Sequence, residues 1–353
     1  MQALAAHLPR LAARIPWVPL GTWPTPIRAV VVAGRTLWIK VEGDADPAYG
    51  GNKVRCLELW LGHARARGAR RIWALGAYGS NHAVATAIHA PRAGLEAAAL
   101  LCPQPRSPWA IENAGALIGA GIELRVVPSV AALPLAALAI AARERGALVM
   151  PPGGATPLGA LGAVSAVFEL AAQIALGVAP APARIVLPLG SACTAAGLLA
   201  GLHLAHATGA WRGRLPIVHA VRVTPWPITS RVRTAVLARR TLARIAALGG
   251  PAVAVGLPEL VHRLVVDPRE LGAGYGEPTA RAERALTALP GIRLDGVYAG
   301  KAASALLRLH GRGEGPLLFW ATKATTILPA PPLAAVRAAP AALVRWLDAA
   351  APR

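Results

Sequence analysis

The stretch Arg71-Ile-Trp-Ala-Leu-Gly-Ala-Tyr-Gly-Ser-Asn-His82 indicates the fold class of this chain. After Arg71, the residues Ile72 to Leu75 are an apolar run of the length and kind that predicts a buried strand. The next residues are mostly small, which indicates a turn, and a helical pattern follows from about His82. A strand, a small-residue turn and a helix in this order form the unit from which parallel sheets are built.

The same unit recurs along most of the chain. A helix is expected at 53–67, where Val54, Leu57 and Leu61 share one face. The other expected strands and helices are strands at 96–101, 123–127, 147–150, 184–189 and 217–223, and helices at 108–120, 130–145, 158–176 and 194–206. This alternation predicts an α/β protein with parallel-rich sheets flanked by helices, and a length of 353 residues suggests about two lobes.

Composition argues against several classes of function. The formal net charge is +20, but the basic residues are scattered, whereas nucleic-acid-binding surfaces are clustered patches. The three cysteines, Cys56, Cys102 and Cys193, form no Cys-x-x-Cys pair and predict a reducing compartment. The N-terminal segment lacks a signal-peptide core, and the longest apolar run, 130–142, is too short to span a bilayer. We therefore expect a cytoplasmic protein with neither nucleic-acid nor membrane partners.

One lysine follows two glycines at the start of a predicted helix, in Gly50-Gly-Asn-Lys53. The chain has only four lysines, Lys40, Lys53, Lys301 and Lys323, so an amine at this position is conspicuous. Lysine can form a Schiff base and exchange a proton when its pKa is lowered, whereas arginine can do neither. A surface lysine is the plain alternative, but the positive end of a helix is a poor place for a cation. Lys53 is therefore the first catalytic candidate.

Two further turns place small and polar residues between a strand and a helix. Ser80, Asn81 and His82 follow the strand at 71–75, and capping of the next helix explains only one of these three polar residues. Ligands of parallel sheets bind at such strand ends, near helix N-termini. The second turn offers backbone N–H groups and hydroxyls to a phosphate, and its residues are Gly190, Ser191, Ala192, Cys193 and Thr194.

Together these segments resemble the 1-aminocyclopropane-1-carboxylate deaminase and D-cysteine desulfhydrase family, which are pyridoxal-phosphate (PLP) enzymes with the tryptophan synthase β-subunit fold (fold type II). The resemblance spans about residues 20–325, and short motifs agree in order and spacing. These motifs are Pro24-Thr-Pro26, Lys40-Val-Glu42, Gly50-Gly-Asn-Lys53 with Arg55, Ser80-Asn-His82, Pro152-Gly-Gly154, Gly190-Ser191, Gly274-Tyr-Gly276 and Val297-Tyr298-Ala-Gly-Lys301.

The resemblance implies two lobes with the cofactor between them, and a homodimer. Residues 1–55 and 170–353 would form the large cofactor-binding domain, and 56–169 a smaller inserted α/β domain. The catalytic residues implied are Lys53, Ser80, Tyr275 and Tyr298. Cofactor contacts are implied for Asn52, Lys53, Asn81, Gly190, Ser191, Ala192, Cys193, Thr194 and Thr322. The substrate would meet Ser80, Asn81, His82 and Tyr298.

In these roles Lys53 would bind PLP as a Schiff base and move the substrate's α-proton. Asn81 would hydrogen-bond the phenolic oxygen of the cofactor, and the 190–194 turn would hold its phosphate. Thr322 would face the pyridine nitrogen, and a hydroxyl there limits the electron sink, which suits elimination over transamination.

The sequence also departs from the family. Cys193 stands where relatives usually have glycine, and Ala321-Thr-Lys-Ala324 replaces a His-Thr-Gly-Gly segment, which brings Lys323 beside the cofactor. Ala299 follows Tyr298 where the cyclopropane deaminases tend to carry glutamate, which favours the desulfhydrase-like branch. The substrate wall is therefore expected to be more altered than the cofactor site.

These residues favour PLP-dependent α,β-elimination or deamination of a small amino acid, which gives a keto acid and ammonia. The alternatives are 1-aminocyclopropane-1-carboxylate deamination, β-replacement, and a degenerate relative that binds PLP without turnover. A metal site at His203 and His206 is not expected, because no acidic or cysteine ligand lies near them in sequence. Cys193 is interpreted as a buried small side chain rather than a reactive thiol.

Overall fold

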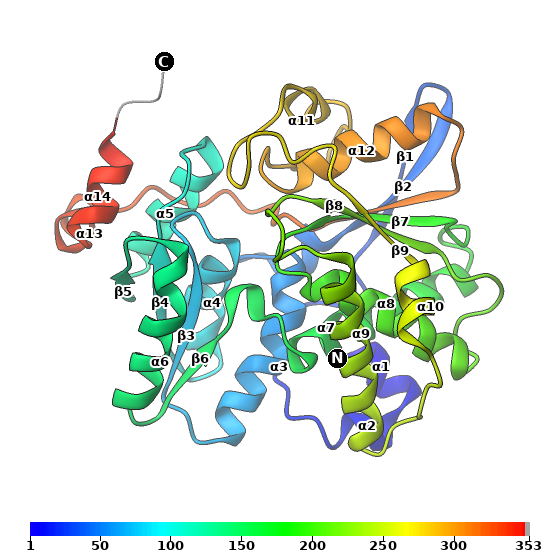
Figure 1. The fold of residues 1–353 in the computed structure, drawn as a ribbon, viewed down its shortest axis with the longest axis horizontal. Coiled ribbons are helices and arrows are strands. Elements are labelled where there is room, and N and C mark those ends of the chain that lie inside the picture. Colours follow the sequence, from blue (N-terminus) through cyan, green and yellow to red (C-terminus); the bar gives the residue numbers. More distant parts are fainter. Residues whose placement is uncertain (350–353) are drawn as a thin grey trace.

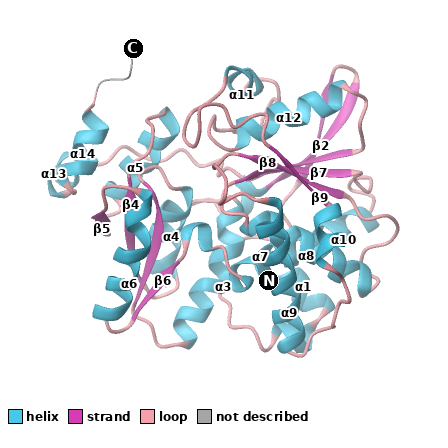
Figure 2. Cartoon of the chain, in the orientation of Figure 1, coloured by secondary structure: helices cyan, strands magenta, loops and turns pink. Residues whose placement is uncertain are grey.

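The computed structural model describes residues 1–349 and contains two separate sheets (Figures 1 and 2). The larger sheet has the spatial order β1-β2-β10-β7-β8-β9, and every neighbouring pair is parallel except the β1–β2 hairpin. Its strands are β1 (Ile27–Val32), β2 (Arg35–Val41), β7 (Arg184–Leu189), β8 (Ile217–Arg222), β9 (Leu264–Asp267) and β10 (Leu317–Ala321).

The smaller sheet has the order β5-β4-β3-β6 and is parallel throughout. Its strands are β3 (Arg71–Ala77), β4 (Glu96–Cys102), β5 (Glu123–Val126) and β6 (Ala147–Met150). Central parallel strands are buried on both faces and read as continuous apolar runs, which is why β3 and β4 could be predicted from the sequence. The edge strands β5 and β6, which were also predicted, are only partly buried. The predicted α/β class with parallel-rich sheets is confirmed.

Helices cover both faces of each sheet (Figure 1). The helices longer than seven residues are α3 (Asn52–Ala66), α4 (Asn81–Arg92), α5 (Pro108–Gly119), α6 (Leu133–Arg143), α7 (Pro157–Ala175), α8 (Cys193–Ala207), α9 (Arg231–Ala247), α12 (Ala299–Gly311) and α14 (Ala341–Asp348). The short ones are α1 (Gln2–His7), α2 (Pro9–Ala12), α10 (Leu257–His262), α11 (Ala280–Ala285), α13 (Leu333–Ala338), and the 3-10 turns η1 (Glu42–Ala45), η2 (Val130–Ala132) and η3 (Pro152–Gly154).

Helix α7 lies in the core and packs against α3 and α8. By length and composition α7 alone among the described residues would suffice to cross a membrane, yet 83% of its apolar window is buried inside the protein. Gly162 lets α7 approach α3 closely, since a side chain there would start 2.3 Å from the Arg55 carbonyl oxygen. This contact fixes the helix whose first turn carries Lys53.

The helix expected at 130–145 differs from the structure at both ends. Residues 130–132 form the 3-10 turn η2, and α6 begins only at Leu133 and ends at Arg143. Pro134 explains the start, because proline is tolerated in the first turn of a helix, where its missing N–H costs no hydrogen bond.

The C-terminal part of the chain returns from the larger sheet to the smaller one (Figure 1). Helix α13 contacts α5, and the Trp346 indole donates to the Gln104 carbonyl at 2.7 Å. The proposed division of the chain into domains at residues 56 and 170 stays a prediction.

Candidate active site

A cavity of about 550 Å³ opens where strands of both sheets end. Its walls come from the segments that follow β3, β4, β7, β8 and β10, and from the start of α3. The carboxyl ends of parallel strands are where such folds bind ligands. We call this space the central cavity. It is lined by each of the residues implied for the site, namely Asn52, Lys53, Ser80, Asn81, His82, Gly190, Ser191, Ala192, Cys193, Thr194, Tyr275, Tyr298 and Thr322.

Lys53 is the second residue of α3, directly after a turn that only glycine adopts easily. Two residues further on, Arg55 is buried and fixes the helix to its surroundings. Its guanidinium donates to Glu42 at 2.6 Å and to Glu169 at 2.9 Å, and lies over the Trp23 ring at 3.8 Å. Such a satisfied network of buried charges is rigid. Lys53 therefore extends into the cavity from a helix that is held rigidly in place.

Glu169 on α7 is the shared anion of this network and also pairs with Lys40. Burial alone would raise the pKa of Glu169, but the charges of Arg55 and Lys40 outweigh burial and bring that pKa down to about 2. The carboxylate is therefore charged at neutral pH. Lys40 is wholly buried and has a structural role, because it also donates to the Thr25 carbonyl at 2.7 Å.

The turn from Gly190 to Thr194 has the form of an anion site. Ala192 adopts a left-handed conformation (φ 70°), and α8 begins at the next residue, so unpaired N–H groups of the first helical turn lie beside the turn. Gly153 lies against it, since a side chain at Gly153 would start 2.4 Å from Ser191 Oγ and 3.3 Å from Lys53 Nζ. The absence of a side chain at Gly153 therefore lets this backbone pack directly against Ser191 and Lys53.

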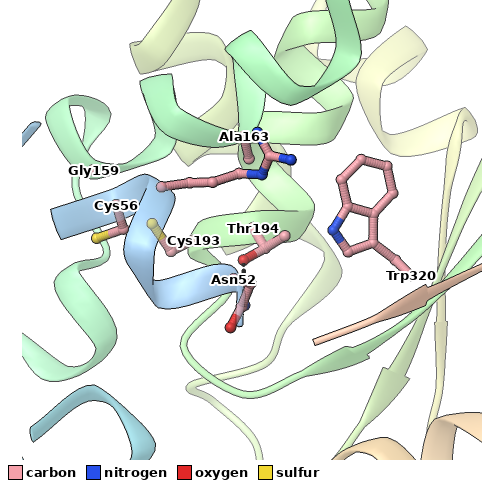
Figure 3. A pocket seen from close by; sticks show the side chains of 8 residues that line it. Asn52, Cys56, Gly159, Ala163, Cys193, Thr194 and Trp320 are labelled. Atoms are coloured by element: carbon pink, nitrogen blue, oxygen red, sulfur yellow. Dashed lines mark hydrogen bonds between the residues drawn. The ribbon is translucent and has the colours of Figure 1, made fainter. Parts of the chain in front are cut away.

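Cys193, which replaces the usual glycine, does not block this turn. Its thiol is buried and points at the Gly154 carbonyl oxygen, 3.5 Å away. Figure 3 shows the small space beside it, with the hydrogen bond from Asn52 Nδ2 to Thr194 Oγ1 (2.8 Å) joining the starts of α3 and α8. This space of about 10 Å³ has room for about one water molecule, and Trp320 lines it.

Asn81 is oriented by three donors to one oxygen. Its Oδ1 accepts from Tyr49 OH at 2.9 Å, from Asn113 Nδ2 at 3.0 Å and from Lys323 Nζ at 3.1 Å. An amide whose oxygen is fully used presents its nitrogen as a donor. The Asn81 Nδ2 group is therefore available to an acceptor such as a phenolate oxygen.

His82 is buried in the cavity wall with both ring nitrogens unpaired within residues 1–349. Burial, and secondly the charge of Lys53, lower the pKa of His82 to about 3, so the ring is neutral. A buried polar ring without partners indicates a site that a ligand completes. Ser80, in contrast, caps α4 by accepting from the Ala83 N–H at 3.2 Å.

Tyr298 and Tyr275 form a pair at another wall of the cavity. The Tyr298 hydroxyl donates to the Tyr275 hydroxyl at 2.8 Å, and the rings meet edge to face. Burial raises the pKa of Tyr298 and raises that of Tyr275 to about 12, so both hydroxyls keep their protons at neutral pH. Lys301 supports the pair, because its amine donates to the Leu271 and Gly274 carbonyls and so fixes the loop before Tyr275.

Lys323 places a second amine in the cavity. It follows Thr322 after β10, is 5% exposed, and lines the same space as Lys53. Burial lowers the pKa of Lys323. The two amines have different neighbours, since Lys53 lies beside Gly153 and Lys323 donates to Asn81.

Several residues of the site were not identified from the sequence. Tyr49 and Asn113 orient Asn81, Asp295 accepts from the Tyr298 N–H at 2.6 Å, and Trp226 stands at the cavity entrance. Only Tyr49 carried a signal, because it directly precedes the glycine pair of the Lys53 motif. Residues 1–349 contain no cluster of three or more histidine, cysteine or acidic side chains that could hold a metal.

Comparisons with known proteins agree on one family. The family model described as pyridoxal-phosphate-dependent enzyme matches residues 18–322. The chain is 39% identical to nocardicin C-9′ epimerase of Nocardia uniformis subsp. tsuyamanensis, over 88% of this chain and 93% of the relative. It is 32% identical to D-cysteine desulfhydrase of Yersinia pestis, over 81% and 86%. A crystal structure of a 1-aminocyclopropane-1-carboxylate deaminase homologue superposes with a TM-score of 0.71, at 30% identity, covering 93% of this chain and 96% of that one.

Proposed function

This chain belongs to the pyridoxal-phosphate-dependent enzyme family, and we propose that it inverts the α-carbon of an amino acid. One observation carries this proposal: two amines, Lys53 and Lys323, line one cavity and have different neighbours in it. A two-base inversion uses one group that takes the α-proton and a second group that returns a proton from the other side. The similarity to an epimerase over most of the chain supports this choice.

The residues of the central cavity fit the cofactor. Lys53 would hold it, the 190–194 turn would receive its phosphate, and Asn81 Nδ2 would donate to its phenolic oxygen. The unpaired ring of His82, which lines the same cavity, agrees with a group bound there. When bound, PLP withdraws electrons from the α-carbon and so makes its proton acidic.

The two lysines would divide the proton transfers between them. Lys53 Nζ would exchange the α-proton on its side of the substrate. The lowered pKa of Lys323 suits an amine that must both release and take up a proton. Ser80, Asn81 and His82 would receive the substrate carboxylate, next to the backbone N–H groups that open α4.

Elimination with deamination is the second candidate, and the Tyr298–Tyr275 pair favours it. Their protonated hydroxyls could donate a proton to a departing β-substituent of a small amino acid. Hydrolysis of the part that remains would then yield a keto acid and ammonia. The relatives named deaminase and desulfhydrase support this alternative. A β-replacement would differ only in the nucleophile that takes the place of the leaving group. Dimerisation and a cytoplasmic location stay predictions.

The test compares the fate of the α-proton with the release of ammonia. The protein is reconstituted with PLP and incubated in D₂O with separate L- and D-amino acids, including D-cysteine. Proton NMR follows the α-hydrogen, chiral chromatography follows inversion, and ammonia and keto acid are assayed in parallel. We expect inversion with little ammonia. Ammonia and keto acid without inversion would overturn the proposal in favour of elimination, and Lys53→Ala should abolish both reactions and the visible band of the bound cofactor.

A further inference from the structure

The central cavity changes character between its inner end and its mouth. The inner end holds Lys53 and the other polar groups described above. We define the mouth group as Val130, Leu133, Trp226 and Ile228, all of which line the same cavity. Val130 and Leu133 come from η2 and α6 beside the smaller sheet, whereas Trp226 and Ile228 come from the loop that follows β8. Val130 is 62% exposed and Trp226 is 71% exposed, whereas Leu133 is 4% exposed.

The loop that carries Trp226 is held in a defined shape. Its anchor is Thr229, which is fully buried and donates from its hydroxyl to the Thr224 carbonyl at 2.5 Å. Pro225 and Pro227 flank the tryptophan, and their rings restrict the backbone on both sides of it. The loop therefore keeps the indole at the entrance of the cavity.

The plain explanation is that these are ordinary exposed side chains, because single apolar residues are common on protein surfaces. The mouth group differs in its arrangement. Four apolar side chains from two separate parts of the fold line one cavity whose inner end gathers polar groups. A polar inner end with an apolar entrance matches a ligand that has a charged head and an apolar tail. None of the four side chains carries a charge that could pair with a polar or charged tail.

We infer that the mouth group binds the outer part of an amino-acid substrate whose side chain ends in an apolar or aromatic group. This inference rests on the proposed reaction at Lys53 and adds the class of substrate. A cavity of about 550 Å³ is within the range that encloses drug-sized ligands, so it can receive more than the cofactor and a small amino acid. Alanine would reach Lys53 and leave Val130 and Trp226 in water.

The test measures binding by the change that amino acids cause in the visible spectrum of the reconstituted holoenzyme. Alanine, phenylalanine and homophenylalanine are titrated as both enantiomers. We expect an aromatic amino acid to half-saturate at a concentration at least about tenfold lower than alanine, and Trp226→Ala to remove that advantage while changing alanine by less than about twofold. Ile327→Ala is the matched control, because Ile327 is 79% exposed and is not part of the cavity wall.

Each outcome separates this inference from the proposed function. If alanine binds as tightly as the aromatic amino acids, or if Trp226→Ala changes all ligands equally, the inferred substrate class is wrong while the reaction at Lys53 stands. If no amino acid changes the spectrum of a protein that carries the Lys53-dependent cofactor band, the proposed function fails and the inference fails with it.

Discussion

Replacement of Lys323 by methionine should separate inversion from proton exchange. Methionine keeps most of the length and volume of the side chain and removes the amine. The substitution should not harm folding, because Lys323 is buried without a carboxylate partner among the described residues, and an apolar side chain avoids the cost of that buried charge. We therefore expect Lys323→Met to fold and to bind PLP.

The expected magnitude follows from the two roles that Lys323 can have. As an acid–base group it would contribute about 10²–10⁴-fold to inversion, or about 3–5 kcal/mol of transition-state stabilisation. As a mere support for Asn81 it would lose one hydrogen bond from an amine, which is worth about 1.5–3 kcal/mol if the amine is charged, and exchange and inversion would then fall together. Tyr49→Phe is the matched control, because it removes another donor from the same Asn81 oxygen at 2.9 Å and leaves both amines in place.

The assay follows each enantiomer separately in D₂O. Lys323→Met should still exchange the α-hydrogen of one enantiomer through Lys53, but should form the opposite enantiomer at least about a hundredfold more slowly. Tyr49→Phe should slow exchange and inversion together by about tenfold or less. Inversion by Lys323→Met within tenfold of the wild type, or an equal loss of exchange and inversion in that variant, would refute the role of Lys323 as the second acid–base group.

Three further predictions test the cofactor site, the network and the tyrosine pair. Gly153→Ala should weaken PLP binding at least about tenfold in a fluorescence titration, because its backbone has φ +65° and the new methyl would lie 2.4 Å from Ser191 Oγ; unchanged affinity would contradict a phosphate site there. The contribution of Glu169 to the free energy of unfolding should fall by about 3 kcal/mol between pH 4.5 and pH 2, since the unfolded chain takes up a proton over this range while the folded carboxyl, with a pKa of about 2, stays largely charged. In chemical denaturation, the free energy of unfolding of Glu169→Gln should fall less steeply as the pH is lowered, and this variant should also be less stable by about 3–5 kcal/mol at pH 7. An identical dependence on pH in both proteins would contradict a buried charged carboxylate at Glu169. Tyr298→Phe should leave inversion within about threefold of the wild type and lower any release of keto acid about a hundredfold, so a large loss of inversion would place this hydroxyl in the epimerase reaction instead.

Much of the fold is predictable from the sequence because local patterns determine it. The runs at 71–75, 96–101 and 184–189 are buried parallel strands, whose apolar composition follows directly from their two covered faces. The turns at strand ends are predictable as well, because Ser80 and the 190–194 segment come soon after strands that can themselves be recognised. The start of α6 was misplaced because an apolar run does not show where its first turn becomes helical.

The partners of Asn81 were not predictable, because they depend on tertiary contacts. Tyr49, Asn113 and Lys323 lie 32, 32 and 242 positions from Asn81 along the chain. No spacing rule connects residues so far apart, so the signals that Tyr49 and Lys323 carry in their own segments do not reveal that both meet Asn81. The entrance formed by Val130 and Trp226 could not be predicted either, since the two residues belong to different parts of the fold.

The four lysines show why burial alone does not identify a catalytic residue. Lys40 and Lys301 are 0% exposed, which is less than the 5% of Lys323, and the rarity of lysine marks all four equally. The amines of Lys40 and Lys301 donate to carbonyl oxygens of fixed loops, so they stabilise structure. Lys323 and Lys53 instead face the central cavity, where a bound molecule can exchange protons with them. The space that an amine faces, rather than its exposure, therefore determines whether it can take part in chemistry.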